Sequence, residues 1–556
     1  MLPMPLPANA EASELGRALG LTRTTAAVLL ARGLRDPVVI QRFLEPRLSH
    51  LTPPETMKDR CEAVDRLARA VRAKERICVF GDYDADGITA AALLTDVLST
   101  LGAEVVPLLA DRFDGGYGLS DRALDRILEA HPSLLVTCDC GSTDHERLER
   151  VRKAGVDAIV IDHHRVPDSP LPALAFLNPH RPGCPFMYKG LASVGLALSV
   201  GAGVRAALGV ALDMRRWLDF VAIGTIGDVA PLDGDNRALV RAGLTMLARG
   251  QRHGTKALSE IAQSHGGIPT GEDVSFRFAP RINAPGRLDK PDLALALLLA
   301  KSEVDARQIA TEVEGFCTRR KEVERAVLSE ALAMLEAPSL GGLPGIVLAR
   351  QGWHPGVVGI VAGRLASRFG KPTVIIALEG ARGRGSARAP AGFSVYDALD
   401  QARDVLVGFG GHHAAAGVEI ESGRVDLFRD RFAEACTSLG VPEVRPSHQA
   451  DALLEGGDPA GRVVGELERF EPCGQGNPAP RIAIARSRVL GVREMRGGHL
   501  RLWIDVDGTR LSCFGADMAP LASRLGPYAT VVGALRRDTW TGGGAVEMRL
   551  VAAEPA

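Results

Sequence analysis

The chain is poor in several features that would place it in a specialised class. Its nine cysteines among 556 residues are odd in number and scattered, so they do not form the framework of a small disulfide-rich protein. Aromatic residues make up only 4% of it. The most apolar run, residues 191–204, is shorter than the roughly 20 residues needed to cross a bilayer. We therefore expect a protein of the reducing cytoplasm that has no membrane segment.

Other signals are also missing. Residues 1–10 lack the basic start and apolar stretch of a secretory signal. No G-x-x-x-x-G-K-[ST] segment occurs, so a nucleotide-driven motor is not supported. The formal net charge of −1 neither supports nor excludes a nucleic-acid partner, because local patches decide such binding. One modest patch exists, since residues 481–556 hold 11 Arg, no Lys and 7 acidic residues.

The length and the residue pattern predict several domains. A hydrophobic content of 46% and a charged content of 24% are ordinary for a globular chain, and 556 residues suggest three or four domains. Apolar strand-like runs at 77–80, 104–108, 134–137 and 158–161 alternate with helical stretches at 89–101 and 120–129. The predicted segments are a helical arm at 1–70 packed on the adjoining domain, a doubly wound parallel-sheet α/β domain at 71–290, long connecting helices at 291–340, a second α/β domain at 341–445 and a small β-barrel of the oligonucleotide-binding (OB) type at 446–556.

Acidic or histidine-bearing motifs come directly after four apolar, strand-like runs. They are Gly81-Asp82-Tyr83-Asp84-Ala85-Asp86-Gly87, Cys138-Asp139-Cys140-Gly141, Asp162-His163-His164 and the stretch 224–231 around Asp228. Ligands of an open parallel sheet lie beyond the carboxyl ends of its strands, so these side chains are expected to converge. The convergence predicts a metal site.

The first motif carries three aspartates at a spacing of two. If this segment stays extended, the side chains of Asp82, Asp84 and Asp86 lie on one face, and such close like charges are ordinarily compensated by a cation. An EF-hand loop starts in the same way, but the position that needs its final glutamate is Leu93.

The mixture of carboxylates and imidazoles suits Mn²⁺, with Mg²⁺ as the weaker alternative, whereas Zn²⁺ more often selects thiolates. Cys138 and Cys140 are too closely spaced for a usual zinc site and are expected to be small buried residues. Two ions about 4 Å apart activate a water and stabilise the leaving oxygen during attack on phosphorus. The predicted reaction is metal-assisted phosphoester hydrolysis.

Taken together, the four motifs resemble the DHH phosphoesterase superfamily and, within it, the RecJ family of single-strand-specific 5′-to-3′ DNA exonucleases. The further matching segments are 32–34, 43–44, 116–119, 178–182, 189–191, 280–287, 353–362, 385–388, 409–417 and 472–478. The resemblance implies a DHH catalytic domain, a long connecting helix, a DHH-associated domain and an OB-fold domain.

The resemblance also implies site residues and two bound ions, Mn²⁺ or Mg²⁺. The implied metal ligands are Asp82, Asp84, Asp86, Asp139, His163, His164 and Asp228, and Asp162 joins them as a catalytic residue. The candidate DNA and phosphate contacts are Arg112, Tyr117, Arg281, Asn283, Arg287, Ser386, Arg388, Gly410, Gly411 and His412. Each arginine can equally be a surface ion pair, and Tyr117 and Trp353 are either base-stacking or packing residues.

The implied function is a 5′-to-3′ exonuclease that releases mononucleotides from single-stranded DNA in repair and recombination. The implied partners are single-stranded DNA, a single-strand-binding protein and a helicase, and a monomer is expected. One alternative is a hydrolase of short oligonucleotides, cyclic dinucleotides, nucleoside bisphosphates or pyrophosphate, although a dinucleotide needs no barrel-lined groove. An inactive DNA-holding scaffold is another alternative, and it predicts missing ligands, yet all are present.

Overall fold

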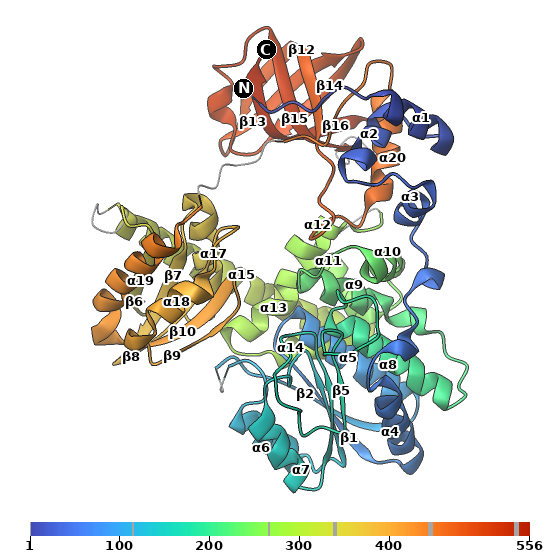
Figure 1. Ribbon diagram of the computed structural model, residues 1–556, viewed down its shortest axis with the longest axis vertical. Coiled ribbons are helices and arrows are strands. Elements are labelled where there is room, and N and C mark those ends of the chain that lie inside the picture. Colours follow the sequence, from blue (N-terminus) through green and yellow to red (C-terminus); the bar gives the residue numbers. More distant parts are fainter. Residues whose placement is uncertain (1, 114–115, 265–266, 337–341, 443–448, 539–543) are drawn as a thin grey trace. The chain divides into compact units, whose positions relative to one another are not determined.

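The computed structural model describes residues 2–113, 116–264, 267–336, 342–442, 449–538 and 544–556 (Figure 1). The chain divides into two compact units. The first unit comprises Met1–Leu108, Leu124–Ala279 and Ser447–Ala556, and the second comprises Leu109–Ala123 and Pro280–Pro446. Among the described residues, no helix is both long and apolar enough to traverse a lipid bilayer.

A five-stranded sheet forms the centre of the first unit, in the order β2-β1-β3-β4-β5. The strands are β1 (Arg76–Gly81), β2 (Glu104–Leu109), β3 (Leu134–Cys138), β4 (Asp157–Ile161) and β5 (Ala175–Leu177). Pairings β1–β3, β3–β4 and β4–β5 are parallel. All five residues of β3 are buried, as expected of a strand that is covered on both faces. The predicted parallel-sheet α/β fold is confirmed.

Helices connect these strands and extend the domain. They are α4 (Arg60–Ala73), α5 (Ala85–Thr100), α6 (Asp121–Glu129), α7 (His145–Lys153), α8 (Ser193–Ala207), α9 (Leu218–Gly227), α10 (Gly234–Arg249), α11 (His253–Ile261), α12 (Gly271–Asp273) and the π-helical turn η4 (Val274–Phe278). Helix α13 (Ala279–Leu288) comes after η4 and belongs to the second unit from Pro280 onward. Helices α5, α8 and α9 pack on one another, and η4 packs on α9. Because α5 and α8 are apolar on nearly every side, they are buried helices of the domain interior.

The C-terminal segment of the first unit is a closed β-barrel. Its strands are β11 (Ala452–Leu453), β12 (Ile482–Met495), β13 (His499–Val506), β14 (Thr509–Gly515), β15 (Tyr528–Arg537) and β16 (Val546–Pro555), and helix α20 (Ala460–Leu467) packs against β15 and β16. The strand order is β11-β12-β13-β14-β16-β15, and pairing of β12 with β15 closes the barrel. The predicted OB-type barrel is confirmed.

The N-terminal helices belong to the core of this barrel. They are α1 (Ala10–Leu19), α2 (Arg23–Ala31) and α3 (Pro37–Leu44). Leu29 and Ile40 share one hydrophobic cluster with Ile482 and Leu502, and the Thr22 hydroxyl donates to Glu466 at 2.6 Å. Helix α3 also meets the adjoining domain, as predicted, since the Phe43 and Leu44 carbonyls accept hydrogen bonds from Arg237 and Arg241 of α10. For α1 and α2 the prediction was wrong, because a periodic local pattern carries no information on distant partners.

The second unit contains a mixed five-stranded sheet. Its strands are β6 (Ile346–Gln351), β7 (Thr373–Glu379), β8 (Arg382–Arg388), β9 (Gly408–Gly411) and β10 (Ala415–Glu421), in the order β6-β7-β8-β10-β9. Its helices are α17 (Val358–Phe369), α18 (Val395–Gln401) and α19 (Val425–Leu439). Only β6 and β7 pair in parallel, and the remaining pairings are antiparallel.

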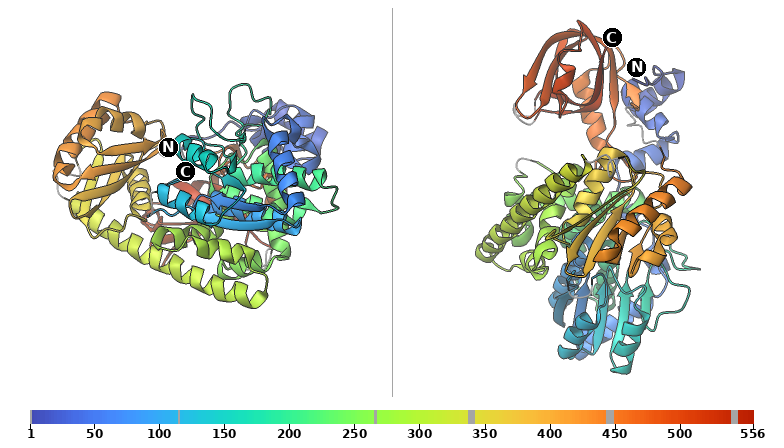
Figure 2. Two further views of the ribbon diagram at one scale, coloured as in Figure 1. Left: turned by 90° about the horizontal axis from the view of Figure 1, so that it is seen from below. Right: turned by 90° about the vertical axis from the view of Figure 1, so that its left-hand side faces the viewer.

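A long helix leads into that sheet. The predicted connecting helices are α14 (Asp292–Leu299) and α15 (Glu303–Leu335), and Figure 2 shows α15 as one continuous rod. The Ser302 side chain caps α15 by accepting the N–H of Asp305. Near its other end, α15 shares a core with α17 through Val327 and Val361. The predicted connector is confirmed as a helix attached firmly to the second α/β domain.

Candidate metal centre and anion-binding cluster

Three aspartates come directly after the ends of three neighbouring parallel strands. Asp82, Asp139 and Asp162 succeed β1, β3 and β4, and their side chains are almost completely buried. Each backbone N–H extends the ladder to the next strand: Asp82 donates to Cys138, Asp139 to Ile161 and Asp162 to Leu177, at 2.9–3.1 Å. The sheet therefore fixes the three side chains at one edge, as the strand-end pattern predicts.

The turn after β3 is unusual. Asp139 adopts a left-handed conformation with φ of 65°, which costs a non-glycine residue about 1 kcal/mol. Gly141, two residues further along, has a φ of 107°. A β-carbon at this position would lie 2.8 Å from the Thr137 hydroxyl oxygen. This strained turn places the Asp139 carboxylate close to the side chains of Asp82 and His163.

The first motif does not stay extended, and that expectation was wrong. Asp84 is the N-cap of α5 and accepts the backbone N–H groups of Asp86 and Gly87, so Asp86 lies in the first helical turn. The reversal is tight, since a β-carbon on Gly87 would lie 2.6 Å from the Asp82 nitrogen. A capping aspartate explains the helix, because its side chain satisfies N–H groups that have no partner within the helix.

Asp86 is held from the opposite side by a second helix. Its two carboxylate oxygens accept the backbone N–H groups of Ser193 and Val194 at 2.7 and 2.9 Å. These residues begin α8, whose N-terminal end carries a partial positive charge. The Ser193 hydroxyl also donates to Asp139 Oδ1 at 3.1 Å. Ser193 was not among the predicted site residues; the available signal was its position as a polar residue near the start of the apolar run 191–204.

The histidine pair comes after β4. Asp162 Oδ1 accepts the backbone N–H groups of His163 and His164 and lies 2.8 Å from His164 Nδ1. Asp162 Oδ2 accepts the Ser142 N–H, and the buried Asn178 amide donates to the His164 carbonyl. Asp162 thus orients the imidazoles, and it belongs to none of the metal-binding groups that the described residues form.

Asp228 comes from a helix rather than a strand, so the predicted strand-like run before it was wrong. It is the C-cap of α9, and Val229 succeeds it in a left-handed conformation with φ of 61°. An evenly apolar run such as 218–227 has no clear periodicity and fits a buried strand or a buried helix equally well.

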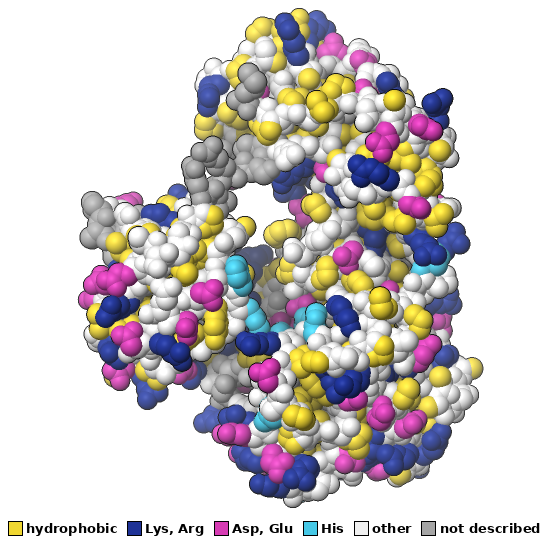
Figure 3. Space-filling model, in the orientation of Figure 1, with side chains coloured by type: hydrophobic (Ala, Val, Ile, Leu, Met, Phe, Trp, Pro, Cys, Tyr) yellow, Lys and Arg dark blue, Asp and Glu magenta, His cyan; other side chains and the backbone are white. Residues whose placement is uncertain are grey.

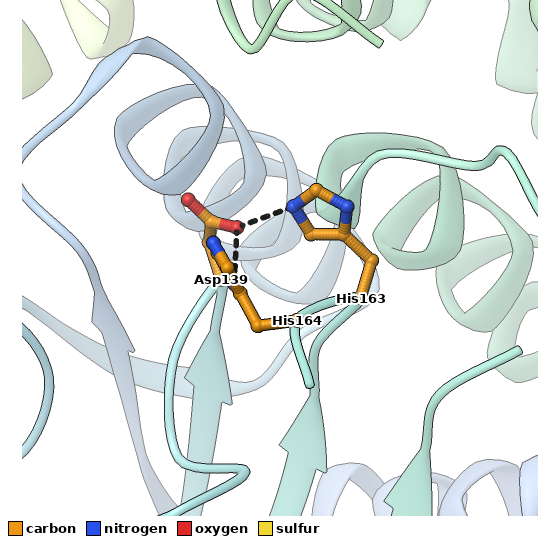
Figure 4. A group of neighbouring side chains, drawn as sticks. All are labelled: Asp139, His163 and His164. Atoms are coloured by element: carbon orange, nitrogen blue, oxygen red, sulfur yellow. Dashed lines mark ion pairs between the residues drawn. The ribbon is translucent and has the colours of Figure 1, made fainter. Parts of the chain in front are cut away.

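The seven predicted ligands nevertheless come together. They form three overlapping groups with ligand atoms within 4.8 Å of one another: Asp139, His163 and His164; Asp86, His163 and Asp228; and Asp82, Asp84 and Asp139. His163 Nε2 lies 3.2 Å from Asp139, 3.6 Å from Asp228 and 3.9 Å from Asp86. Figure 4 shows Asp139, His163 and His164 pointing toward one another, with the Asp139 oxygen between the two rings.

The pKa shifts reflect burial of the carboxylates and the repulsion between them. Burial, and after it repulsion from Asp84, raises the pKa of Asp86 to about 7, and burial with repulsion from Asp86 raises the pKa of Asp228 to about 9. Burial and the same neighbours raise the pKa of Asp139. Burial lowers the pKa of His163 to about 4, which leaves the ring neutral and able to bind a metal.

His164 and Asp162 behave differently from these groups. Although burial opposes both shifts, their hydrogen bond lowers the pKa of Asp162 to about 2 and raises the pKa of His164 to about 9. Divalent cations fit the seven ligands, because clustered oxygen ligands with imidazole nitrogens suit Mn²⁺ and bound charge relieves the repulsion.

Two cysteines flank Asp139 and play no part in the metal groups. Cys138 and Cys140 are fully buried, and burial raises the pKa of both thiols. The thiols are therefore neutral and serve as small core residues, as expected.

A second cluster lies in the second unit and has the opposite charge. Burial and then the neighbouring Arg112 lower the pKa of Arg388, so two guanidinium groups are close together. A β-carbon on Gly359 would lie 3.0 Å from Arg388 Nη2 and 3.2 Å from the Ser386 hydroxyl oxygen, at the start of α17. Arginine forks, a hydroxyl and a helix N-terminus in one place suit an anion such as a phosphate.

The other candidate DNA contacts are of two kinds. Residues of the first kind form hydrogen bonds or ion pairs within the protein, and residues of the second kind are exposed or hold a buried oxygen with no hydrogen bond. Arg281 forms a bidentate ion pair with Glu314, and Arg287 donates to the Gly356 carbonyl. Trp353 is buried and donates to Glu330, so its base-stacking alternative was wrong. The second kind comprises Tyr117, whose side chain is exposed, Asn283, whose Oδ1 is buried without a hydrogen bond, and Gly410, Gly411 and His412, which lie in and after the edge strand β9.

The parallel sheet with its strand-end cluster, the mixed-sheet domain and the closed barrel define a protein of the DHH class. Three known families match the chain: the DHH family, N-terminal domain, over residues 76–225, the DHHA1 domain over 342–438 and the RecJ OB domain over 450–552.

The single-stranded-DNA-specific exonuclease RecJ of Escherichia coli is 34% identical over 86% of this chain and 86% of its own length. That of Thermus thermophilus is 34% identical over 98% of this chain and 77% of its own. The crystal structure of RecJ in complex with Mn²⁺ from Thermus thermophilus matches with a TM-score of 0.84 and 32% identity, covering 100% of this chain and 78% of that one. The chain belongs to the RecJ family, which confirms the predicted resemblance.

Proposed function

We propose that this protein is a metal-dependent, single-strand-specific 5′-to-3′ DNA exonuclease that releases mononucleotides and acts in repair and recombination. The observation that carries the proposal is the buried cluster of five carboxylates and two imidazoles, whose mutual repulsion bound cations would relieve. The names of its relatives, which are single-stranded-DNA-specific exonucleases, support the substrate.

The ligands would hold two Mn²⁺ or Mg²⁺ ions. Bound there, such ions lower the pKa of a water and stabilise charge on the phosphate oxygens. The chain supplies the remaining functions. Asp162 fixes the orientation of His164, Ser193 and the α8 N-terminus fix Asp139 and Asp86, and Asn178 holds the histidine turn. Such supporting contacts keep ligands in position for catalysis.

The anion-binding cluster is proposed to hold the 5′-terminal phosphate. Arg112 and Arg388 supply charge and Ser386 supplies a hydroxyl. Arg281, Arg287 and Asn283 are proposed as further contacts to the DNA strand. The exposed residues Gly410, Gly411 and His412 and the ring of Tyr117 are proposed to contact neighbouring phosphates or bases.

A barrel face with aromatic and basic side chains supports a longer substrate than a dinucleotide. Trp503 lies over Gly491, where a β-carbon would be 3.3 Å from the ring, and Arg510 stacks on it at 4.9 Å. On the same face Arg501 stacks on Phe514 at 5.4 Å. Base stacking on aromatic rings beside a basic groove is the usual mode of single-strand binding by OB folds. A cyclic dinucleotide would leave this face unused.

Local arrangement matters more than total charge for such binding. Over the face shown in Figure 3, acidic and basic side chains of the described residues are interspersed, in keeping with the net charge of −1. DNA contacts are therefore assigned to particular strands rather than to a general positive field.

Location and partners complete the proposal. All nine cysteines are free, which supports a reducing compartment such as the cytoplasm. The protein is proposed to work as a monomer. Because a single-strand-specific nuclease does not cleave duplex DNA, a helicase is proposed to supply single strands. A single-strand-binding protein is proposed to present them.

A time course on DNA labelled at either end tests the proposal. Single-stranded, duplex and 3′-blocked substrates are incubated with Mn²⁺, Mg²⁺ or EDTA. We expect labelled mononucleotides from the 5′ end of single strands at once, no product in EDTA, and no effect of the 3′ block. Preference for dinucleotides, or binding without cleavage in Mn²⁺, contradicts the proposal.

A further inference from the structure

One large apolar side chain of the first unit is unusually exposed. Phe276, in the π-helical turn η4, has 75% of its surface accessible. Its neighbours Val274 and Phe278 are fully buried, and η4 packs against α9. The turn therefore already buries the apolar side that stabilises it, and Phe276 adds nothing to that core. Isolated exposed apolar side chains are common on proteins, so the position of Phe276 between two other elements, rather than its exposure, carries the inference.

The turn touches a helix of the metal centre on one side. Helix α9, against which η4 packs, ends next to Asp228, one of the proposed metal ligands. π-helical turns of this kind are uncommon and occur often at functional sites. Phe276 is thus carried by an element that contacts the wall of the metal centre.

The helical segment that holds η4 touches the barrel segment on its other side. Gly271 donates its N–H to Glu471, and a β-carbon on Gly271 would lie 2.1 Å from the Cys473 carbonyl oxygen. One residue further, Glu272 forms an ion pair with Arg549 of β16. Glu272 and Phe276 are four residues apart and so lie on the same side of the helical segment.

From Arg549 the contacts continue across the aromatic face of the barrel. Arg549 and Phe514 are register partners on the paired strands β16 and β14, so they lie side by side on one face. Phe514 is stacked by Arg501, and Trp503 lies two residues further along β13, also on that face. The segment that carries Phe276 is thus linked, through Glu272 and Arg549, to the face of the barrel that carries Phe514 and Trp503.

We propose that Phe276 is a base-stacking residue for single-stranded DNA on the route between the metal centre and the barrel. The inference rests on the proposed function, because it assigns a contact to the same substrate. The occupant is a nucleobase, since the surface continues the aromatic and basic face of the barrel and every base offers a ring for stacking. Arg277 and Arg549 lie beside it and form ion pairs with Asp273 and Glu272, so the recognition is assigned to the stacking ring rather than to these charges.

The test compares Phe276→Ala with Phe276→Trp and with Phe369→Ala, a control that removes an exposed ring from α17. Each is made in an Asp139→Ala background, so that DNA is not degraded. Affinity is measured for a long thymidine strand, together with the fluorescence of 2-aminopurine placed at successive positions from the 5′ end. Thermal unfolding checks that each variant is folded.

We expect Phe276→Ala to weaken binding of the long strand by about tenfold, the effect of one stacked base, and to restore 2-aminopurine fluorescence at one position. Phe276→Trp should retain both the affinity and the quenching, and Phe369→Ala should match the parent. Equal affinity of Phe276→Ala and Phe369→Ala overturns the inference while the exonuclease proposal stands. Failure of the parent protein to bind single strands removes both.

Discussion

The metal centre and the anion-binding cluster carry opposite charges but are built on the same principle. In the metal centre, burial and the neighbouring carboxylates raise the pKa values of Asp86, Asp139 and Asp228. In the second, burial and a neighbouring guanidinium lower the pKa of Arg388. Each cluster brings together side chains of one charge, and their mutual repulsion adds to the effect of burial on the pKa. Metal ions would supply the missing positive charge in the first cluster, and a phosphate would supply the missing negative charge in the second.

The largest effect should come from removing a ligand of the metal centre. Asp139→Ala is expected to lower kcat by at least about a thousandfold, because ligands that act as a unit fail together. Binding of single-stranded DNA should change little, since the stacking and phosphate contacts remain. Rates of mononucleotide release and DNA affinity are measured side by side. Asp65→Ala, an exposed aspartate on α4, is the control; full activity of Asp139→Ala would exclude Asp139 as a ligand.

The anion-binding cluster should respond in a different parameter. Arg388→Met is expected to lower kcat/KM on 5′-phosphorylated strands by about 10- to 100-fold, the value of a charge-assisted hydrogen bond, mainly through KM. Strands with a 5′-hydroxyl should lose much less. The matched control is Arg384→Met, which removes an exposed arginine from the same strand. An equal loss on both kinds of 5′ end would argue that Arg388 is structural.

A smaller and more selective effect is expected at Ser193. Ser193→Ala removes the hydroxyl donor to Asp139 but keeps the backbone N–H that Asp86 accepts. Loss of such a supporting contact typically weakens metal affinity by about 10- to 100-fold. The Mn²⁺ concentration that gives half of the maximal turnover rate should rise, and the rate should recover at saturating Mn²⁺. Ser199→Ala, on the same helix but bonded to Arg60, should leave the curve unchanged; a loss that excess Mn²⁺ does not restore would contradict the positioning role.

The subtlest effect concerns pH and stability. The raised pKa values of Asp86 and Asp228, about 7 and about 9, exceed the value near 3.9 of an unfolded aspartate. Between these limits the metal-free folded protein holds protons that the unfolded chain has released. The stability that these carboxyls contribute is therefore lost as pH rises from about 4 to about 9.

Thermal unfolding in EDTA should show this decline in Tm, and Mn²⁺ should abolish it because metal binding has already displaced the protons. Asp228→Asn should flatten the EDTA curve, since its amide does not titrate. A Tm in EDTA that is constant or that rises over this range would be incompatible with the shifted pKa values.

Part of the metal centre was predictable from local sequence. A short apolar run that ends in Asp82, Asp139 or Asp162 marks both a buried strand and its polar end, so the sheet edge could be predicted. The turn of Asp84 into a helix was signalled by an N-cap aspartate before a run rich in alanine, but the spacing of two favoured an extended interpretation. The element before Asp228 was misassigned because a uniformly apolar segment has no period.

The remainder depends on contacts between distant residues. The Thr22–Glu466 bond, which ties the N-terminal helices to the barrel, joins residues 444 positions apart. The contacts of Ser193 with Asp139 and of Glu272 with Arg549 are also distant in sequence. No local pattern encodes such partners, and Trp353 likewise shares its cluster with Val327 and Ala331 of the distant helix α15.

Crystals grown with Mn²⁺ and measured at its absorption edge would locate the ions themselves. We expect two anomalous peaks about 4 Å apart, surrounded by Asp82, Asp84, Asp86, Asp139, His163, His164 and Asp228. A single ion, ions held by other residues, or no ion at saturating Mn²⁺ would contradict the two-metal centre.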